Sequence, residues 1–208
     1  MTTRLRVEGL RVVYDGAPPV FDDWSTTLGA DCRVALLFGD SGSGKTTLLR
    51  VLAGELAASA GRIIVAGRAR DGDRDGWRRQ VCWIDPSTTA FDAMTPAAFV
   101  DQWRDRYPGF DDDGWQRHVD GFGLAAQLGK RFDQLSTGTR RKAWIAASLA
   151  SGAPLTLLDE PTAALDRPSI DHLWRSLAAV RERADRLVLV ASFDRPSGVR
   201  FDAVVELP

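Results

Sequence analysis

The strongest constraint on how this chain can fold lies in residues 39–46, which follow the pattern G-x-x-x-x-G-K-[ST]. They come directly after a short apolar run at 34–38 and open a segment with helical spacing at 45–54. In a strand–turn–helix of this kind, backbone N–H groups of the turn surround phosphate oxygens, and the positive end of the helix adds to the attraction. The pattern therefore predicts a phosphate-binding loop in a fold of alternating strands and helices.

The side chains of this loop have separate expected roles. Lys45 brings a cation to the β- and γ-phosphates of a nucleotide, and the hydroxyl of Thr46 is a ligand for Mg²⁺. An ordinary Gly/Ser turn before a capped helix is the alternative, and it leaves the Lys-Thr pair unexplained. We expect the nucleotide to contact Gly39, Asp40, Ser41, Gly42, Ser43, Gly44, Lys45, Thr46 and Thr47.

An acidic pair ends another apolar run. Residues 155–158 read as a buried strand, and Asp159 and Glu160 follow it directly. A carboxylate at the carboxyl end of a strand can hold Mg²⁺ through water, which is the role expected for Asp159. Glu160 is placed to polarise an attacking water, so it is the candidate catalytic base. A strand followed by a solvated acidic turn is the alternative for these two residues taken alone.

The rest of the chain alternates between strand and helix patterns. We read residues 68–79, which are charged and contain Gly, as a solvated turn, and 87–150 as an all-helical insert. This order predicts an α/β protein with a parallel sheet and a helical subdomain. The expected strands are 5–14, 34–38, 62–65, 81–84, 155–158, 187–192 and 203–207, and the expected helices are 45–54, 95–107, 111–121, 139–150 and 168–183.

Composition excludes several classes of protein. The net charge of −1 gives no overall field for holding a polyanion, so no nucleic-acid partner is expected. No apolar run approaches the roughly 18 residues of a membrane-spanning helix, and the first residues lack the pattern of a signal peptide. Two cysteines are too few for a disulfide framework, which favours a reducing compartment.

With these motifs in this order, the chain resembles the ATP-binding cassette (ABC) family, the nucleotide-binding subunits of ABC transporters. Residues 135–139 (LSTGT) are similar to the family signature LSGGQ, and 160–166 are similar to the stretch from the catalytic Glu into the D-loop, which ends here at Asp166. Tyr14 stands where the family has an aromatic residue that stacks on adenine; an ordinary strand-end Tyr is the alternative.

The resemblance implies the whole architecture and the reaction. It implies one domain over 1–208, with a P-loop NTPase core at 1–86 and 151–208 that has a mainly parallel sheet and an N-terminal antiparallel β part. The inserted helical subdomain, 87–150, would carry the signature. It also implies hydrolysis of ATP to ADP and phosphate with Mg²⁺, coupled to transport by a separate transmembrane permease. The subunit would then lie in the cytoplasm, peripherally on the inner face of the cell membrane.

The resemblance further implies a dimer. In the family two subunits pack head to tail, and each ATP lies between the phosphate loop of one subunit and the signature of the other. The signature residues here would face the ATP of a partner chain, in a homodimer or in a heterodimer with another cassette subunit. These residues are Ser136, Thr137, Gly138 and Thr139.

Two positions depart from the family pattern. Pro86 stands where the family has a Gln that reaches Mg²⁺, and Phe193 stands where it has a switch His that contacts the γ-phosphate. Neither side chain can replace those contacts, although the carboxylates of Asp85 and Asp194 lie beside them in sequence. We therefore expect turnover that is slow or depends on a partner.

Three readings stay open on these data. The insert is similar to that of subunits serving exporters of the ABC-2 type, but any helical insert with polar breaks would look alike. An ATP-gated dimerising switch with little hydrolysis would fit the altered positions 86 and 193. A non-transport cassette ATPase acting on DNA or ribosomes is disfavoured by the near-zero net charge.

Overall fold

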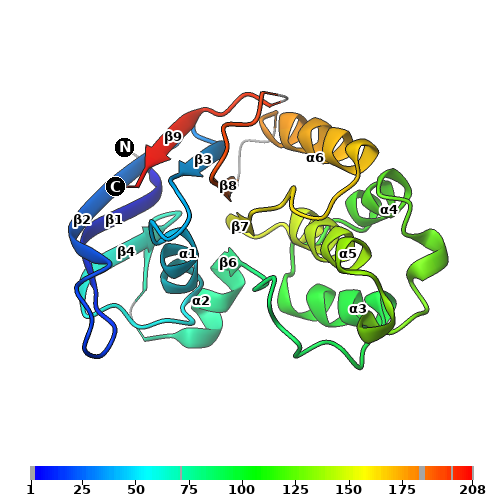
Figure 1. Cartoon of the computed structure of the whole chain (residues 1–208), viewed down its shortest axis with the longest axis horizontal. Helices are drawn as coiled ribbons and strands as arrows, with labels where there is room; N and C mark the ends of the chain where they lie inside the picture. The colour runs from blue at the N-terminus through cyan, green and yellow to red at the C-terminus, as the bar shows by residue number, and fades with distance from the viewer. Residues whose placement is uncertain (1–2, 71, 183–185, 198, 208) are drawn as a thin grey trace.

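Two β-sheets and a group of helices make up the fold, seen in a computed structural model that describes residues 3–70, 72–182, 186–197 and 199–207 (Figure 1). The first sheet is antiparallel and has the strand order β2-β1-β4-β5. It is built from the amino-terminal part of the chain. Its strands are β1 (Thr3–Val12), β2 (Phe21–Gly29), β4 (Ala60–Val65) and β5 (Arg68–Ala69).

The second sheet is parallel and has the order β6-β7-β8-β3-β9. Its central strands are mostly apolar and buried because both faces are covered, as in other parallel sheets. Phe38 pairs with Ser192 and Asp159 with Ala191, so the carboxyl ends of the three central strands lie side by side. The strands are β3 (Val34–Phe38), β6 (Val81–Cys82), β7 (Leu155–Asp159), β8 (Leu187–Ser192) and β9 (Ala203–Glu206).

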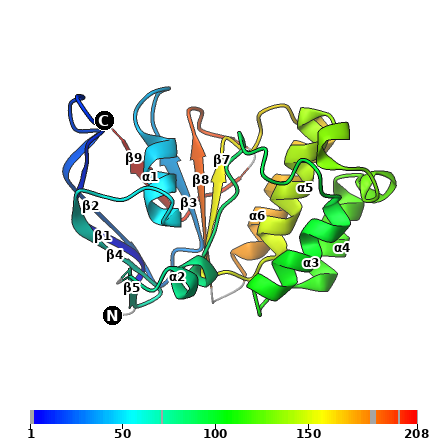
Figure 2. The ribbon, with the colours of Figure 1, turned by 90° about the horizontal axis from the view of Figure 1, so that it is seen from below.

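Helices cover the parallel sheet on both sides. Helix α1 (Lys45–Ala53) lies between the two sheets, and its apolar face packs in one core with residues of both (Figure 2). Four helices cover the opposite face of the parallel sheet. They are α3 (Pro96–Arg106), α4 (Asp112–Gly121), α5 (Thr137–Ala150) and α6 (Arg167–Val180), with the short 3₁₀ turns η1 (Ala125–Gln127) and η2 (Phe132–Gln134) between α4 and α5.

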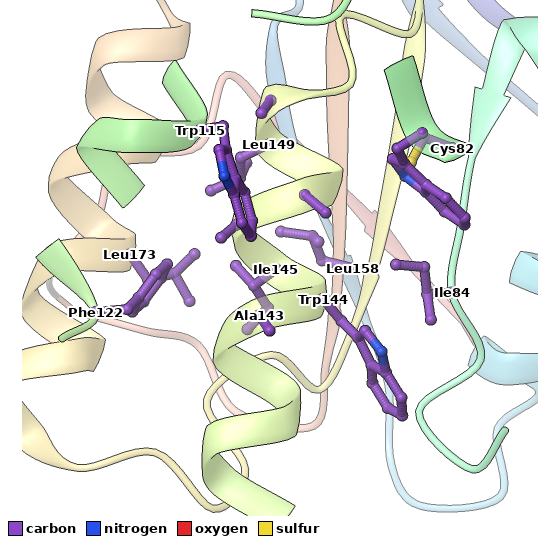
Figure 3. Close-up of a cluster of buried hydrophobic side chains, with 14 of the residues drawn as sticks. Cys82, Ile84, Trp115, Phe122, Ala143, Trp144, Ile145, Leu149, Leu158 and Leu173 are labelled. Atoms are coloured by element: carbon purple, nitrogen blue, oxygen red, sulfur yellow. The ribbon is translucent and has the colours of Figure 1, made fainter. Parts of the chain in front are cut away.

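Helix α5 is the centre of the second core. Figure 3 shows Trp144 beside Ile84 on one side of this helix, and Phe122 beside Leu173 on the other. The carboxyl-terminal half of α5 is buried throughout, whereas its first residues are exposed or half-buried. The core therefore fixes the helix firmly and leaves its amino terminus at the surface.

The structure confirms the predicted class of fold, a parallel α/β core with an antiparallel β part and a helical insert. It also confirms the predicted start of α3, because the backbone N–H of Ala98 donates to the Thr95 hydroxyl at 3.2 Å, with Pro96 in the first turn. Among the described residues, no helix combines the length and the hydropathy needed to cross a membrane.

The prediction of a solvated turn at 68–79 was wrong. Strand β5 and helix α2 (Arg74–Gln80) occupy this segment. Asp73 caps the helix, accepting the backbone N–H of Gly76 at 2.9 Å, and the buried Trp77 indole donates to the Leu52 carbonyl at 2.9 Å. The burial of one indole ring in the core therefore stabilises a helix here despite the polar composition of the segment.

Other elements also differ from the sequence prediction. Strand β2 was not predicted, because alternation is weak where most of its residues are exposed or half-buried. The strand predicted at 81–84 is shorter and ends at Cys82. Helix α6 ends at Val180, and position 183, where we expected its end, lies outside the described residues.

Candidate nucleotide-binding site

The loop between β3 and α1 has the conformation that a phosphate-binding turn requires. Gly42 and Gly44 have φ angles of 88° and 94°, which only glycine adopts without strain. A Cβ at position 44 would lie 2.8 Å from the Val20 side chain. Helix α1 begins at Lys45 with no side chain capping its first turn, so its amino-terminal N–H groups are directed at the space above the loop.

Lys45 is held at the centre of this loop. Its side chain is only 7% exposed, and its amino group donates to the carbonyls of Gly39 at 2.6 Å and Asp40 at 2.9 Å. The carboxylate of Glu160 lies 3.7 Å from the same amino group. A buried cation is thereby fixed beside the N–H groups of the loop, an arrangement that suits the binding of an anion such as a phosphate.

The structure brings the two sequence motifs together. The hydroxyl of Thr46 donates to Oδ2 of Asp159 at 2.8 Å, although the residues are 113 positions apart in the chain. A hydroxyl and a carboxylate, both oxygen donors, are the kind of ligand that Mg²⁺ takes, so the donor set fits that ion. A cavity of ≈ 340 Å³ joins them, lined by Ser41, Gly42, Gly44, Lys45, Thr46, Thr47, Asp159, Glu160 and Phe193.

Burial raises the pKa of both carboxyl groups at the end of β7. For Asp159 the hydrogen bond from Thr46 and the charges of Lys45 and Arg141 oppose this rise. For Glu160 the charge of Lys45 opposes it, together with the Phe193 backbone N–H and the Ser192 hydroxyl, which bond to the carboxylate. The net pKa of Glu160 stays above its ordinary value, which makes its carboxylate a better acceptor for a proton from water.

The backbone of Glu160 is unusual. Its φ angle of 43° lies in the left-handed region, which few residues other than glycine adopt. The backbone N–H donates to the Ala191 carbonyl on β8 at 3.0 Å. Such a conformation persists only where its surroundings hold it, and it turns the side chain of Glu160 toward Lys45.

Tyr14 lies beside the phosphate loop. It follows the end of β1, its side chain is 40% exposed, and its hydroxyl is 3.2 Å from the hydroxyl of Thr47 on α1. An exposed aromatic ring next to the phosphate loop is in a suitable place to contact the base of a nucleotide.

The signature residues lie away from this cavity. None of the four is among the described residues that line it. Ser136 caps α5, accepting the backbone N–H of Thr139 at 3.2 Å, and both Ser136 and Thr137 are exposed. Gly138 is required by close packing, because a Cβ there would lie 2.4 Å from the carbonyl oxygen of Ala164.

Asp166 caps helix α6 at the end of the segment that follows Glu160. Its side chain accepts the Ser169 N–H at 3.0 Å and pairs with Lys142 of α5 at 2.9 Å. The bonds from Ser169 and Lys142 lower the pKa of Asp166 to about 2. The predicted D-loop is thus tied to the helix that begins at the signature.

Positions 86 and 193, which depart from the family pattern, differ in their surroundings. Phe193 lines the nucleotide cavity and is 55% exposed, whereas Pro86 lines a separate cavity of ≈ 30 Å³ behind Asp159. Asp85 pairs with Arg50 at 2.7 Å and accepts two bonds from Ser87. Burial would raise the pKa of Asp85, but these bonds lower it below its ordinary value. Its carboxylate is therefore committed to Arg50 and Ser87.

Two contacts of Glu160 were missed by the sequence analysis. Ser192 ends β8, and its place at the carboxyl edge of a parallel sheet is a signal that could have indicated it. Arg141 donates to the Glu160 carbonyl at 2.5 Å, and nothing in a basic helical segment distinguishes it from its neighbours.

Comparison with known proteins shows the family of this chain. A family model described as ABC transporter matches residues 21–163. The chain belongs to the ABC transporter family. It is 34% identical over 184 residues to a phosphonates import ATP-binding protein of Chromohalobacter salexigens, covering 81% of this chain and 68% of that protein. It is 39% identical over 138 residues to a cytochrome c biogenesis ATP-binding export protein of Mesorhizobium japonicum, covering 66% and 67%.

A solved structure has the same fold. The structure of an ATP-binding subunit of an ABC transporter aligns with a TM-score of 0.85 at 23% identity, over 99% of this chain and 86% of the other. This ABC protein is therefore an ATP-binding subunit, an ATPase coupled to transport, with the fold of P-loop NTPases.

Proposed function

We propose that this chain binds Mg²⁺–ATP and, by hydrolysing it, powers a separate membrane-spanning permease from the inner face of the membrane. The observation that carries the proposal is the single cavity shared by Lys45, the Thr46–Asp159 pair and Glu160. The relatives include an import and an export ATP-binding protein, which supports a transport role without choosing a direction.

The residues of the proposed site have separate tasks in this reaction. Lys45 and the loop N–H groups bind the β- and γ-phosphates, Thr46 and Asp159 hold the metal ion, and Tyr14 packs on the base. Glu160 orients the attacking water and accepts its proton at the carboxylate. Magnesium supplies positive charge to the phosphates when it is bound.

The chain acts as one domain and as half of a dimer in this proposal. Residues 1–86 and 151–208 form the nucleotide-binding core, and 87–150 form the subdomain that bears the signature. The exposed, capped start of α5 offers Ser136, Thr137, Gly138 and Thr139 to the ATP of a partner chain. Since these residues do not line the chain's own cavity, a second cassette subunit, identical or not, completes each site.

Turnover of the isolated chain is slow in this proposal. Phe193 lines the cavity where the family has its switch His, and a phenyl ring cannot donate a hydrogen bond to a phosphate. The same observation favours one alternative, an ATP-gated dimer that hydrolyses little and signals by closing. Purification from the native host in detergent decides between the two, because a permease accompanies a transporter subunit and does not accompany a soluble switch.

Binding of ATP is tested at Lys45. We expect the parent chain to bind ATP with a micromolar dissociation constant and a requirement for Mg²⁺. Lys45→Ala removes the buried cation beside the phosphates, and affinity should fall by about 10²-fold or more, the loss of a charged hydrogen-bonding partner. Isothermal titration calorimetry measures both constants.

The matched control is Lys130→Ala, which removes an exposed lysine that does not line the cavity. Its affinity for ATP should equal that of the parent. Binding by Lys45→Ala that equals the parent's would contradict the assignment of the loop.

A further inference from the structure

Glu160, the residue assigned here as the catalytic base, depends on a contact from the helix that begins at the signature. Its carbonyl oxygen accepts two hydrogen bonds, from the backbone N–H of Ala163 at 3.0 Å and from the guanidinium of Arg141 at 2.5 Å. Its backbone N–H is bound to β8 through Ala191. The peptide groups on both sides of this left-handed residue are therefore held from outside the turn.

One face of α5 lies along the segment 160–166. Gly138 packs against the Ala164 carbonyl, Arg141 bonds to the Glu160 carbonyl, and Lys142 pairs with Asp166. Positions 138, 141 and 142 follow the i, i+3, i+4 spacing that places residues on one side of a helix. Of these three contacts, that of Arg141 reaches the residue whose carboxylate performs the chemistry.

The surroundings of Arg141 fix its direction. It is half-buried and lines the small cavity behind Asp159, together with Pro86 and Trp144. A guanidinium enclosed in this way has few other orientations, and its planar fork loses little entropy when it bonds. The contact with Glu160 is therefore built into the packing of α5 on β7.

We propose that Arg141 is a positioning residue, which holds the main chain of Glu160 in the left-handed conformation that directs its carboxylate at the attacking water. The inference rests on the proposed function, because it assigns Glu160 as the base. Arg141 acts through Glu160 and leaves the phosphate loop untouched, so its loss should change the rate of hydrolysis and not the affinity for ATP. A displacement of about 1 Å in a catalytic group costs up to about 10²-fold in rate.

The test measures hydrolysis and binding separately in Arg141→Gln. Single-turnover hydrolysis of radiolabelled ATP, with the chain in excess, resolves even a slow rate. We expect the rate to fall by about tenfold or more, with a dissociation constant for ATP within about twofold of the parent's. Arg141→Lys keeps a donor and should recover part of the lost rate.

Arg140→Gln is the matched control. Arg140 lies next to Arg141 on the same helix and donates to the carbonyl of Phe132 at 3.1 Å, away from Glu160. The Arg140→Gln variant should hydrolyse ATP at the parent rate. Thermal melting shows that each variant folds. The inference is overturned if Arg141→Gln hydrolyses at the parent rate, or if Arg140→Gln slows to the same extent.

A parent chain that hydrolyses no ATP would contradict the proposed function and not this inference. Hydrogen exchange then decides the inference by itself. Faster exchange of the amides of residues 160 and 162–164 in Arg141→Gln, with unchanged exchange in Arg140→Gln, supports positioning. Equal exchange in the parent and Arg141→Gln overturns it.

Discussion

The two edges of the nucleotide cavity differ in what their side chains can do. On the edge formed by the phosphate loop and β7, Lys45, Thr46 and Asp159 all have hydrogen-bond partners within the site. On the edge formed by β8, Phe193 offers an exposed ring with no polar group. In the proposed reaction, the groups that bind ATP therefore lie on the first edge, and the position that matches the family's switch His lies on the second. A chain can therefore keep the edge that binds ATP and alter the other edge, because groups that bind ATP equally in the ground and transition states contribute nothing to the rate.

The largest expected effect is that of replacing Glu160, which lies between the two edges. Glu160→Gln keeps the shape of the side chain and removes the proton acceptor, so hydrolysis should fall by about 10²–10⁴-fold while binding persists. ATP should then remain between two subunits, and the chain should elute as a dimer. Phosphate release and size-exclusion chromatography with Mg²⁺–ATP measure the two effects.

A second substitution provides the control for that experiment. Ser136→Arg, added to Glu160→Gln, places a bulky cation where the signature would meet the partner's ATP, and this double variant should stay monomeric. A monomer in the single variant with ATP counts against a composite site in a homodimer, whereas a chain that forms only heterodimers shows the dimer once its partner is added.

Phe193 tests the altered edge directly. A hydrogen-bond donor aimed at the transition state can change a rate by about 10²–10³-fold, so Phe193→His should raise a low basal turnover by up to about that factor. Steady-state phosphate release at saturating ATP is the measurement. Phe193→Leu lacks a donor and should leave turnover low. A parent chain that is already fast alone would mean that another group, such as Asp194, supplies the contact.

The smallest expected effect concerns the stability of the fold and comes from a pair of histidines that do not line the cavity. Because this stability depends on pH, it sets the pH range in which the two edges can be compared. Nδ1 of His118 on α4 lies 3.2 Å from Nε2 of His172 on α6. Burial and, to a smaller extent, the neighbouring His172 and arginines lower the pKa of His118 to about 3. Folding therefore keeps His118 neutral.

As pH falls below about 6.5, the unfolded chain takes up a proton that the folded chain refuses, so the free energy of unfolding falls until about pH 3. One such group lowers the free energy of unfolding by about 2 kcal/mol between pH 7.5 and pH 5. Urea unfolding at the two pH values should show this loss in the parent and less of it in His118→Gln. Equal losses in both proteins would show that His118 is not the group responsible.

Much of the fold followed from the sequence because its signals are local. The turn between β3 and α1, the start of α3 at Thr95 and the apolar runs of β7 and β8 each depend on residues close together in the chain. Helix α2 escaped prediction because its stability comes from Trp77 reaching Leu52, a contact that no window of sequence contains. The similarity of the insert to ABC-2 exporters stays a prediction.

By itself, the sequence determined the phosphate loop, the acidic pair at 159–160 and the pattern at 135–139 that resembles the family signature, because backbone geometry sets the spacing within one strand, turn or helix. Only the tertiary structure decided that Thr46 reaches Asp159, that the ring of Phe193 faces the cavity, and that Ser192 and Arg141 hold Glu160. These contacts join segments that the order of strands in the sheet brings side by side. Packing selects such neighbours, and distance along the chain does not.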